Sequence, residues 1–120
     1  MIIAIDFDGT CVDHQYPLVG APAPGAVETL RALAGRGHGL ILWTMRSGKF
    51  LNDAITWFAD HGIPLYGVQS NPTQSEWSSS PKAYANIYID DAGFGAPLIF
   101  PEDFARPCID WAQVKETLLS

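Results

Sequence analysis

The chain has 120 residues, of which 48% are hydrophobic and 17% charged, a balance that excludes an intrinsically disordered chain. Its formal net charge of −6 disfavours extended binding to a nucleic-acid backbone or to an anionic membrane. No segment approaches the roughly 20 apolar residues needed to cross a bilayer, and Met1–Asp6 lacks the basic region of a signal peptide. Two cysteines, Cys11 and Cys108, are too few for a disulfide framework. We therefore expect one cytoplasmic domain, residues 1–120, with reduced thiols.

The first part of the chain predicts a strand, a helix and a second strand. A continuous apolar run over Ile2–Ile5 is typical of a strand that is buried on both faces, as in a parallel sheet. A loop over Val12–Pro22 follows. A helix is then expected to begin after Pro24 and to end at Gly35, where the helical spacing of its apolar residues stops. The second continuous run, Leu40–Trp43, predicts the next strand.

The middle of the chain repeats this alternation of helix and strand. An apolar stripe from Leu51 to Phe58 predicts a helix that stops at Gly62. The run Leu65–Val68 predicts a weaker strand. The segment Gln69–Pro81 is rich in Ser, Asn, Thr and Pro, which indicates a loop.

The last part of the chain predicts two more strands and a helix. Ile87–Ile89 has the continuous apolar pattern of a buried strand, and Pro97–Phe100 is a weaker candidate. The last helix is expected to begin at Asp110, whose carboxylate caps it while the side chain of Gln113 reaches back. Strands alternating with helices predict a three-layer α/β domain with right-handed crossovers. Ligands of open α/β sheets bind beyond the carboxyl ends of the strands, so we expect the chemistry there.

Two carboxylates follow the first predicted strand. Residues i and i+2 of an extended segment point the same way, so Asp6 and Asp8 can reach one pocket, and Gly9 permits a sharp turn of the backbone. Two carboxylates this close repel each other unless a cation or a shared proton relieves them. The alternative is a capping aspartate with a solvated neighbour.

A second acidic pair, Asp90 and Asp91, follows the strand that ends at Ile89. Parallel strands bring their carboxyl ends to one edge of the sheet, so Asp6, Asp8 and Asp90 can converge. Hard oxygen ligands with room for water suit Mg²⁺. Read alone, Asp-Asp after a strand is also typical of a turn or a helix cap, but together with the first pair it favours a metal site.

Three further residues are candidates for binding phosphate. Thr44 follows a predicted strand and precedes a helix, where a hydroxyl and backbone N–H groups suit a phosphate oxygen. Arg46 could clamp a second phosphate or a carboxylate. Lys82 could neutralise carboxylates and phosphate together, and Lys49 is the other lysine that could do so. The alternatives are that Thr44 only caps the helix and that the lysine is a solvated surface residue.

Two residues in the predicted loops have roles that the sequence leaves open. His14 could contact the leaving group of a substrate, or it is a solvated loop histidine. Trp77 could stack on a substrate or form an interaction patch, and packing over the core is the alternative.

These residues, in this order, resemble the haloacid dehalogenase-like superfamily, which is dominated by Mg²⁺-dependent phosphatases. Asp6-Phe7-Asp8-Gly9-Thr10 looks like its first motif, Thr44 its second, Lys82 its third, and Asp90-Asp91 its fourth. The resemblance spans residues 6 to 91, and the first motif is its most specific part.

The resemblance implies a Rossmann-like sheet and hydrolysis of a phosphomonoester through an aspartyl-phosphate. Asp6 would be the nucleophile, and Asp8 would protonate the leaving oxygen and then activate water. Mg²⁺ would be held by Asp6, Asp90 and the main-chain carbonyl of Asp8. Thr44 and Lys82 would bind phosphate, and Asp91 would orient the metal site or Lys82. Beside these we expect Arg46 to contribute to phosphate binding and Thr10 to support the site.

The spacing of the motifs leaves no room for a cap domain. The residues from Thr10 to Thr44 and from Thr44 to Lys82 are taken up by predicted loops, helices and strands, whereas even a small domain needs ~50 residues. An open, capless site would suit a phosphorylated small molecule or the phosphorylated end of a larger substrate. A homo-oligomer in which a partner subunit covers part of the site remains open.

Two other classes of function are alternatives. A phosphoacceptor receiver domain shares the length, the α/β sheet and the acidic Mg²⁺ pocket. That class needs an acceptor aspartate at the end of a middle strand, where this sequence has Thr44 and Gln69. The second alternative is a non-catalytic interaction domain on the same fold, which the filled set of expected catalytic positions disfavours.

Overall fold

The structure is a computed structural model that describes all 120 residues. Its helices and strands, in chain order, are β1 (Ile2–Ile5), α1 (Ala26–Gly35), β2 (Gly39–Leu42), α2 (Gly48–Asp60), β3 (Gly67–Val68), the 3₁₀ turn η1 (Gln74–Glu76), β4 (Ile87–Ile89), β5 (Leu98–Ile99), β6 (Cys108–Ile109) and α3 (Trp111–Leu119). The strands β3-β2-β1-β4 form one sheet in that order, and β5 and β6 form a separate pair. All neighbours in the larger sheet are parallel.

The register of the sheet brings three strand ends to the same level. Ile5 of β1 lies opposite Leu42 of β2 and Ile89 of β4. The backbone ladder continues one step further, because Asp6 N donates to Ile89 O at 3.0 Å and Trp43 N donates to Ile5 O at 2.9 Å. The polar residues that follow β1, β2 and β4 therefore emerge at one edge of the sheet.

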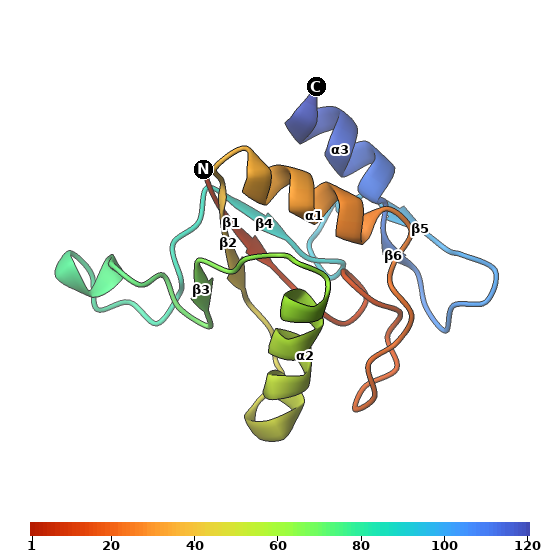
Figure 1. Ribbon diagram of the computed structural model, residues 1–120, viewed down its shortest axis with the longest axis horizontal. Helices are drawn as coiled ribbons and strands as arrows, with labels where there is room; N and C mark the ends of the chain where they lie inside the picture. Colours follow the sequence, from red (N-terminus) through yellow and green to blue (C-terminus); the bar gives the residue numbers. More distant parts are fainter.

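One face of the sheet packs against the helices. A single buried cluster joins Ile3 and Ile5 of β1 to side chains from all three α-helices, among them Leu30 of α1, Phe58 of α2 and Trp111 of α3. Helices α1 and α3 lie side by side over the strands (Figure 1). Apolar burial on this face is the main source of stability for the fold.

The segment between β3 and β4 contacts the other face of the sheet at Tyr88. Tyr88 of β4 points to this side, and its hydroxyl donates to the carbonyl of Ala83 at 2.6 Å. Ala83 and Ala85 are buried, as are Ala4 and Ile41 of the neighbouring strands. The segment holds the short turn η1 and no α-helix, and it first projects beyond β3 (Figure 1).

The predicted α/β fold is confirmed: a parallel sheet, flanking helices and no separate cap. The predicted strand over Leu65–Val68 shortens to β3. The weak strand expected over Pro97–Phe100 forms β5, which lies outside the main sheet and pairs antiparallel with β6, a strand that the sequence did not predict. Asp110 caps α3 by accepting from Gln113 N at 3.3 Å, but the reciprocal side-chain bond of a capping box is absent. None of the helices combines the length and the apolarity that crossing a membrane requires.

Candidate functional site: an acidic cleft at the strand ends

A cleft of about 470 Å³ lies at the carboxyl ends of β1, β2 and β4. Its lining residues are Asp6, Asp8, His14, Tyr16, Thr44, Met45, Arg46, Asp90, Asp91, Ala92 and Arg106. This is the edge of the sheet at which the strand pattern predicted the chemistry, and the predicted residues from all three strand ends are present.

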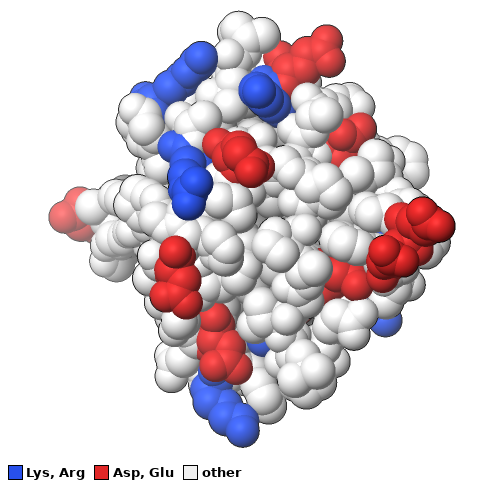
Figure 2. Space-filling view, turned by 45° about the vertical axis from the view of Figure 1, so that its right-hand side comes forward, with Lys and Arg blue, Asp and Glu red and all other residues white.

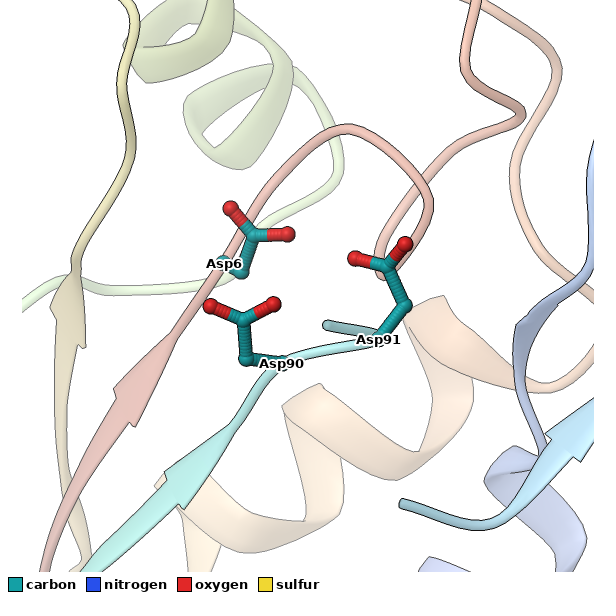
Figure 3. A group of neighbouring side chains, drawn as sticks. All are labelled: Asp6, Asp90 and Asp91. Carbon is teal, nitrogen blue, oxygen red and sulfur yellow. The ribbon is translucent and has the colours of Figure 1, made fainter. Parts of the chain in front are cut away.

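Three carboxylates in the cleft come close enough to share one cation. Oxygen atoms of Asp6, Asp90 and Asp91 lie within 4.8 Å of one another, and Figure 3 shows these side chains at the ends of β1 and β4 grouped around a common space. Burial, a hydrogen bond with the side chain of Asp91 and the charges of Asp90 and Asp91 raise the pKa of Asp6 to about 8. Crowding of three carboxylates therefore costs free energy when no cation is present.

Thr10 and Gly9 hold the carboxylates in this arrangement. The buried hydroxyl of Thr10 lies 3.1 Å from an Asp6 oxygen and 3.3 Å from an Asp91 oxygen, and it accepts from Asp91 N at 3.2 Å. Gly9 has a φ of +81°, and a Cβ there would lie only 2.5 Å from an oxygen of Asp91. A side chain at this position would displace Asp91, so the turn after β1 requires glycine. Thr10 thus has the supporting position that the sequence predicted.

Asp8 is paired with Arg46 instead of joining the other carboxylates. Both oxygens of Asp8 accept from the guanidinium, Nε to Oδ2 at 2.8 Å and Nη2 to Oδ1 at 2.8 Å. This is the one ion pair of the structure, and Arg46 is only 2% exposed. Its remaining donors contact the carbonyls of Pro17, Leu18 and Phe50. Every donor of the guanidinium therefore has a protein acceptor.

This pairing bears on two sequence predictions. The expected magnesium ligands were Asp6, Asp90 and the main-chain carbonyl of Asp8; the structure groups the carboxylate of Asp91 with those of Asp6 and Asp90, and the carboxylate of Asp8 lies with Arg46. Only the main-chain carbonyl of Asp8, which accepts no hydrogen bond, is free to contribute. Arg46 was expected to clamp a phosphate or a carboxylate; it holds the carboxylate of Asp8, and its other donors are occupied by main-chain carbonyls. The physical reason is that an arginine on the loop after β2 satisfies a nearby buried carboxylate.

Thr44 lies where the sequence placed it, on the wall of the cleft. Its hydroxyl accepts from Arg46 N at 3.1 Å and still has a proton to donate. The side chain of Gln69 brackets its backbone, accepting from Thr44 N at 2.9 Å and donating to Thr44 O at 2.5 Å. Gln69 has a φ of +58°, which is costly for a residue other than glycine. The structure thus uses a strained residue to fix the position of Thr44.

The two candidate lysines lie outside the cleft. The ammonium of Lys82 sits over the ring of Tyr88 at 5.1 Å, on an exposed stretch before β4. Because no helix precedes β4, nothing directs this lysine toward the strand ends. Lys49, in the first turn of α2, is exposed and lies over Phe50 at 5.2 Å. The structure does not bring either lysine to Asp6.

The cleft also contains residues that the sequence left open or did not single out. His14 lines it, whereas Trp77 lies elsewhere and packs edge-on against Tyr84 at 5.7 Å. Arg106, which the sequence analysis missed, also lines the cleft. It lies 15 positions after Asp91 in a stretch without a motif or a periodic pattern, so no sequence signal could have found it.

Asp13 ties the segment that carries Arg106 to the loop after β1. It is buried at 4% exposure, and its two oxygens accept from Ala105 N at 3.0 and 3.2 Å. Burial raises the pKa of Asp13, but hydrogen bonds from the Gln15 side chain and from nearby backbone amides outweigh it and hold the pKa below its usual value. Asp13 is therefore a structural anchor and not a ligand of the cleft.

The donor set at the strand ends fits a hard divalent cation. Asp6, Asp90 and Asp91 offer only carboxylate oxygens, which Mg²⁺ prefers. No histidine or cysteine is among them, and Cys11, the nearest thiol in sequence, is buried and lies 3.3 Å from the carbonyl of Asp6. The raised pKa of Asp6 means that its carboxylate form is disfavoured in this site, and a bound cation would stabilise that form.

No protein-family model matches the chain, and no curated protein matches it. Among solved structures, the chain is similar to a conserved protein from Bacteroides thetaiotaomicron, with 37% sequence identity and a TM-score of 0.82. The chain belongs to the family of that protein. The similarity covers 99% of this chain and 89% of the other, so it includes the sheet and the strand ends that form the cleft.

Proposed function

We propose that the protein is a Mg²⁺-dependent phosphohydrolase of the haloacid dehalogenase-like type, acting on a phosphomonoester through an aspartyl-phosphate. The observation that carries this proposal is the group of Asp6, Asp90 and Asp91 within 4.8 Å of one another, beside Thr44 in one cleft. A nucleophilic carboxylate, a cation site and a phosphate-binding hydroxyl are the parts that phosphoryl transfer through an aspartate needs.

Asp6, Asp90 and the carbonyl of Asp8 are the proposed magnesium ligands, and Asp91 either joins them or orients them through Thr10. The bound cation would offset the repulsion between these carboxylates and the phosphate dianion. Thr44 would donate its hydroxyl proton to a phosphoryl oxygen, because its backbone is fixed by Gln69.

Asp6 is the proposed nucleophile. One of its oxygens attacks phosphorus, the bond from phosphorus to the ester oxygen breaks, and the leaving oxygen takes a proton. In the second step a water molecule attacks the same phosphorus, the bond to Asp6 breaks, and inorganic phosphate is released. Asp6 returns to its carboxylate form, so the net reaction is hydrolysis of the ester.

Asp8 is the proposed carrier of the proton in both steps. It would protonate the leaving oxygen and later take a proton from the attacking water. Arg46 occupies both of its oxygens, so Asp8 can carry a proton only if one of these contacts opens. We therefore expect proton transfer to be coupled to a small rotation of the Asp8 side chain away from Arg46.

A phosphorylated small molecule, or the phosphorylated end of a larger molecule, is the proposed substrate. The cleft is open and no cap covers it. Figure 2 shows acidic and basic side chains interspersed on one face of the molecule, with no continuous basic tract that would bind a nucleic-acid backbone.

The test is hydrolysis of p-nitrophenyl phosphate by purified protein with and without Mg²⁺. We expect turnover only with Mg²⁺, and a loss of at least about 1,000-fold in kcat for Asp6→Asn, because the substituted amide is a poor nucleophile. Asp53→Asn, which removes an exposed carboxylate on α2, is the matched control and is expected to keep full activity. Absence of turnover, or equal turnover by Asp6→Asn, would point instead to a non-catalytic domain.

A further inference from the structure

The cleft is acidic, and neither of the two cations that the sequence predicted for it is free to neutralise an incoming phosphate. Lys82 lies over Tyr88 and away from the strand ends. Arg46 lies in the cleft, but its donors are all used by Asp8 and by main-chain carbonyls. A guanidinium in this state can orient a carboxylate, and it has no donor left for an incoming anion.

Apart from Arg46 and His14, Arg106 is the remaining basic side chain that lines the cleft. It is exposed, and its guanidinium makes no ion pair, hydrogen bond or ring contact within the protein. All five of its N–H donors are thus available to a ligand. Its planar fork matches the geometry of phosphate oxygens, to which arginine binds through two parallel hydrogen bonds.

The segment that carries Arg106 is held beside the loop of Asp6 and Asp8. On one side of Arg106, Ala105 N donates to both oxygens of buried Asp13. On the other side, Ile109 N donates to Gly9 O at 3.2 Å, next to Asp8. These two ties, one residue before and three residues after Arg106, fix where its side chain starts.

We propose that Arg106 supplies the positive charge that receives the phosphoryl group of the substrate, in the role that the sequence assigned to Lys82, and that Asp13 is the positioning residue for it. This inference rests on the proposed function. A metal ion would offset two of the three charges of Asp6, Asp90 and Asp91, so an arriving phosphate dianion would still meet net negative charge. A guanidinium with free donors at the same cleft offsets part of that charge without displacing the metal ligands.

The experiment compares three cation-to-amide variants: Arg106→Gln, Lys82→Gln and, as the matched control, Arg36→Gln at the exposed end of α1. The readouts are kcat/KM for p-nitrophenyl phosphate and, by calorimetry with Mg²⁺ present, the Kd of inorganic phosphate. We expect Arg106→Gln to lower kcat/KM and to weaken phosphate binding by about 10- to 100-fold, as charge-assisted hydrogen bonds predict. Arg36→Gln is expected to change neither, and Arg106→Lys to restore part of the loss.

Asp13 is tested through its dependence on Arg106. Asp13→Asn is expected to weaken phosphate binding in the otherwise native chain, and to cause no further loss when Arg106→Gln is already present. An equal loss in both backgrounds would show that Asp13 acts on the cleft by another route and would contradict its positioning role.

The outcomes separate this inference from the proposed function. Turnover by the native protein that Arg106→Gln leaves unchanged, or that Lys82→Gln lowers more, would overturn the inference and leave the phosphohydrolase intact. No turnover, with phosphate binding that depends on Arg106, would overturn the proposed function and support the anion site. Phosphate binding that does not depend on Arg106 would overturn the inference whatever the activity.

Discussion

The carboxylates in the two halves of the cleft differ in whether a cationic side chain neutralises them. Asp8 is fully compensated, because both of its oxygens are held by a buried arginine that is 2% exposed. Asp6, Asp90 and Asp91 lie within 4.8 Å of one another, and no cationic side chain is paired with them. The two halves are separated by a single residue, Phe7.

The difference indicates which carboxylate the fold itself neutralises and which carboxylates are left for a ligand to neutralise. A half-buried carboxylate whose charge the fold neutralises is expected to carry its partner with it. Burial, the hydrogen bond with Asp91 and the neighbouring charges raise the pKa of Asp6 to about 8, so its carboxylate form is disfavoured until a cation binds. Substitutions in each half of the cleft test this difference.

The largest effect on stability is expected from breaking the ion pair between Asp8 and Arg46. Arg46→Ala leaves the Asp8 carboxylate poorly solvated and three main-chain carbonyls without their donor. We expect the free energy of unfolding to fall by about 3–5 kcal/mol, the usual cost of an uncompensated buried charge. Urea denaturation measures it, with Arg36→Ala as the exposed control.

The pairing is isolated by a double-mutant cycle. Adding Asp8→Ala to Arg46→Ala removes the orphaned charge, so we expect part of the lost stability to return. Additive losses for the two substitutions would mean that the ion pair is not the source of the effect.

A gain in stability is expected from removing one charge from the group of Asp6, Asp90 and Asp91. Asp6→Asn removes one of the crowded charges, and we expect about 1–3 kcal/mol of stabilisation in metal-free buffer at pH 8–9. The folded-state pKa of Asp6 lies near 8, above its usual 3.8. The native chain therefore loses stability as the pH rises from about 4 to 8, because the unfolded chain ionises first. The gain of the variant should grow over the same window.

Mg²⁺ should reverse this order. With Mg²⁺ in excess, the native chain and Asp53→Asn gain stability by ligand binding, and Asp6→Asn does not. If Asp6→Asn proved less stable than the native chain in chelator at pH 8, repulsion among these carboxylates would not outweigh the contacts that Asp6 makes in the fold.

A smaller effect is expected at Asp13, a compensated carboxylate outside the cleft. Its pKa is lowered because hydrogen bonds outweigh its burial, so it contributes stability that is fully present above pH 4. That contribution disappears as the pH falls through its folded-state pKa. We expect Asp13→Asn to cost about 1–2 kcal/mol at pH 7 and the difference from the native chain to shrink below pH 4. A difference that stays constant with pH would be inconsistent with a stabilised carboxylate.

The smallest effect is expected from Lys82→Gln. Because its ammonium lies over Tyr88 and contacts neither half of the cleft, the free energy of unfolding should stay within about 0.5 kcal/mol of the native value. Thermal unfolding with and without Mg²⁺ checks this, and a larger stabilisation of the variant by Mg²⁺ would place the lysine at the cleft, because removal of a neighbouring positive charge favours a bound cation.

Local patterns explain why most of the fold could be predicted. Continuous apolar runs at β1, β2 and β4 are typical of strands covered on both faces; the structure buries most of β1 and β2 in that way, whereas in β4 only Ile89 is buried and Tyr88 is exposed. The pair of β5 and β6 could not be predicted, because each strand has only two residues and their pairing joins positions nine and eleven residues apart. A pattern that short has no measurable period.

The residues of the site also fall into two groups: those that local sequence patterns predict and those whose position depends on long-range contacts. Asp6, Asp90 and Thr44 were predicted because each directly follows a recognisable strand, and parallel strands end at one edge. The pairing of Arg46 with Asp8 and the arrival of Arg106 depend on loop paths. No sequence pattern encodes a loop path. The positive charge of Arg46 suggested a phosphate role for it, and Arg106 was not predicted.

The most direct test of the account is a calorimetric titration of MgCl₂ into the purified protein. The arrangement of Asp6, Asp90 and Asp91 predicts one Mg²⁺ per chain for the native protein and for Asp53→Asn, and loss of that binding for Asp90→Asn. Unchanged binding in Asp90→Asn, or no binding by the native chain, would contradict the claim that these carboxylates are held for a cation.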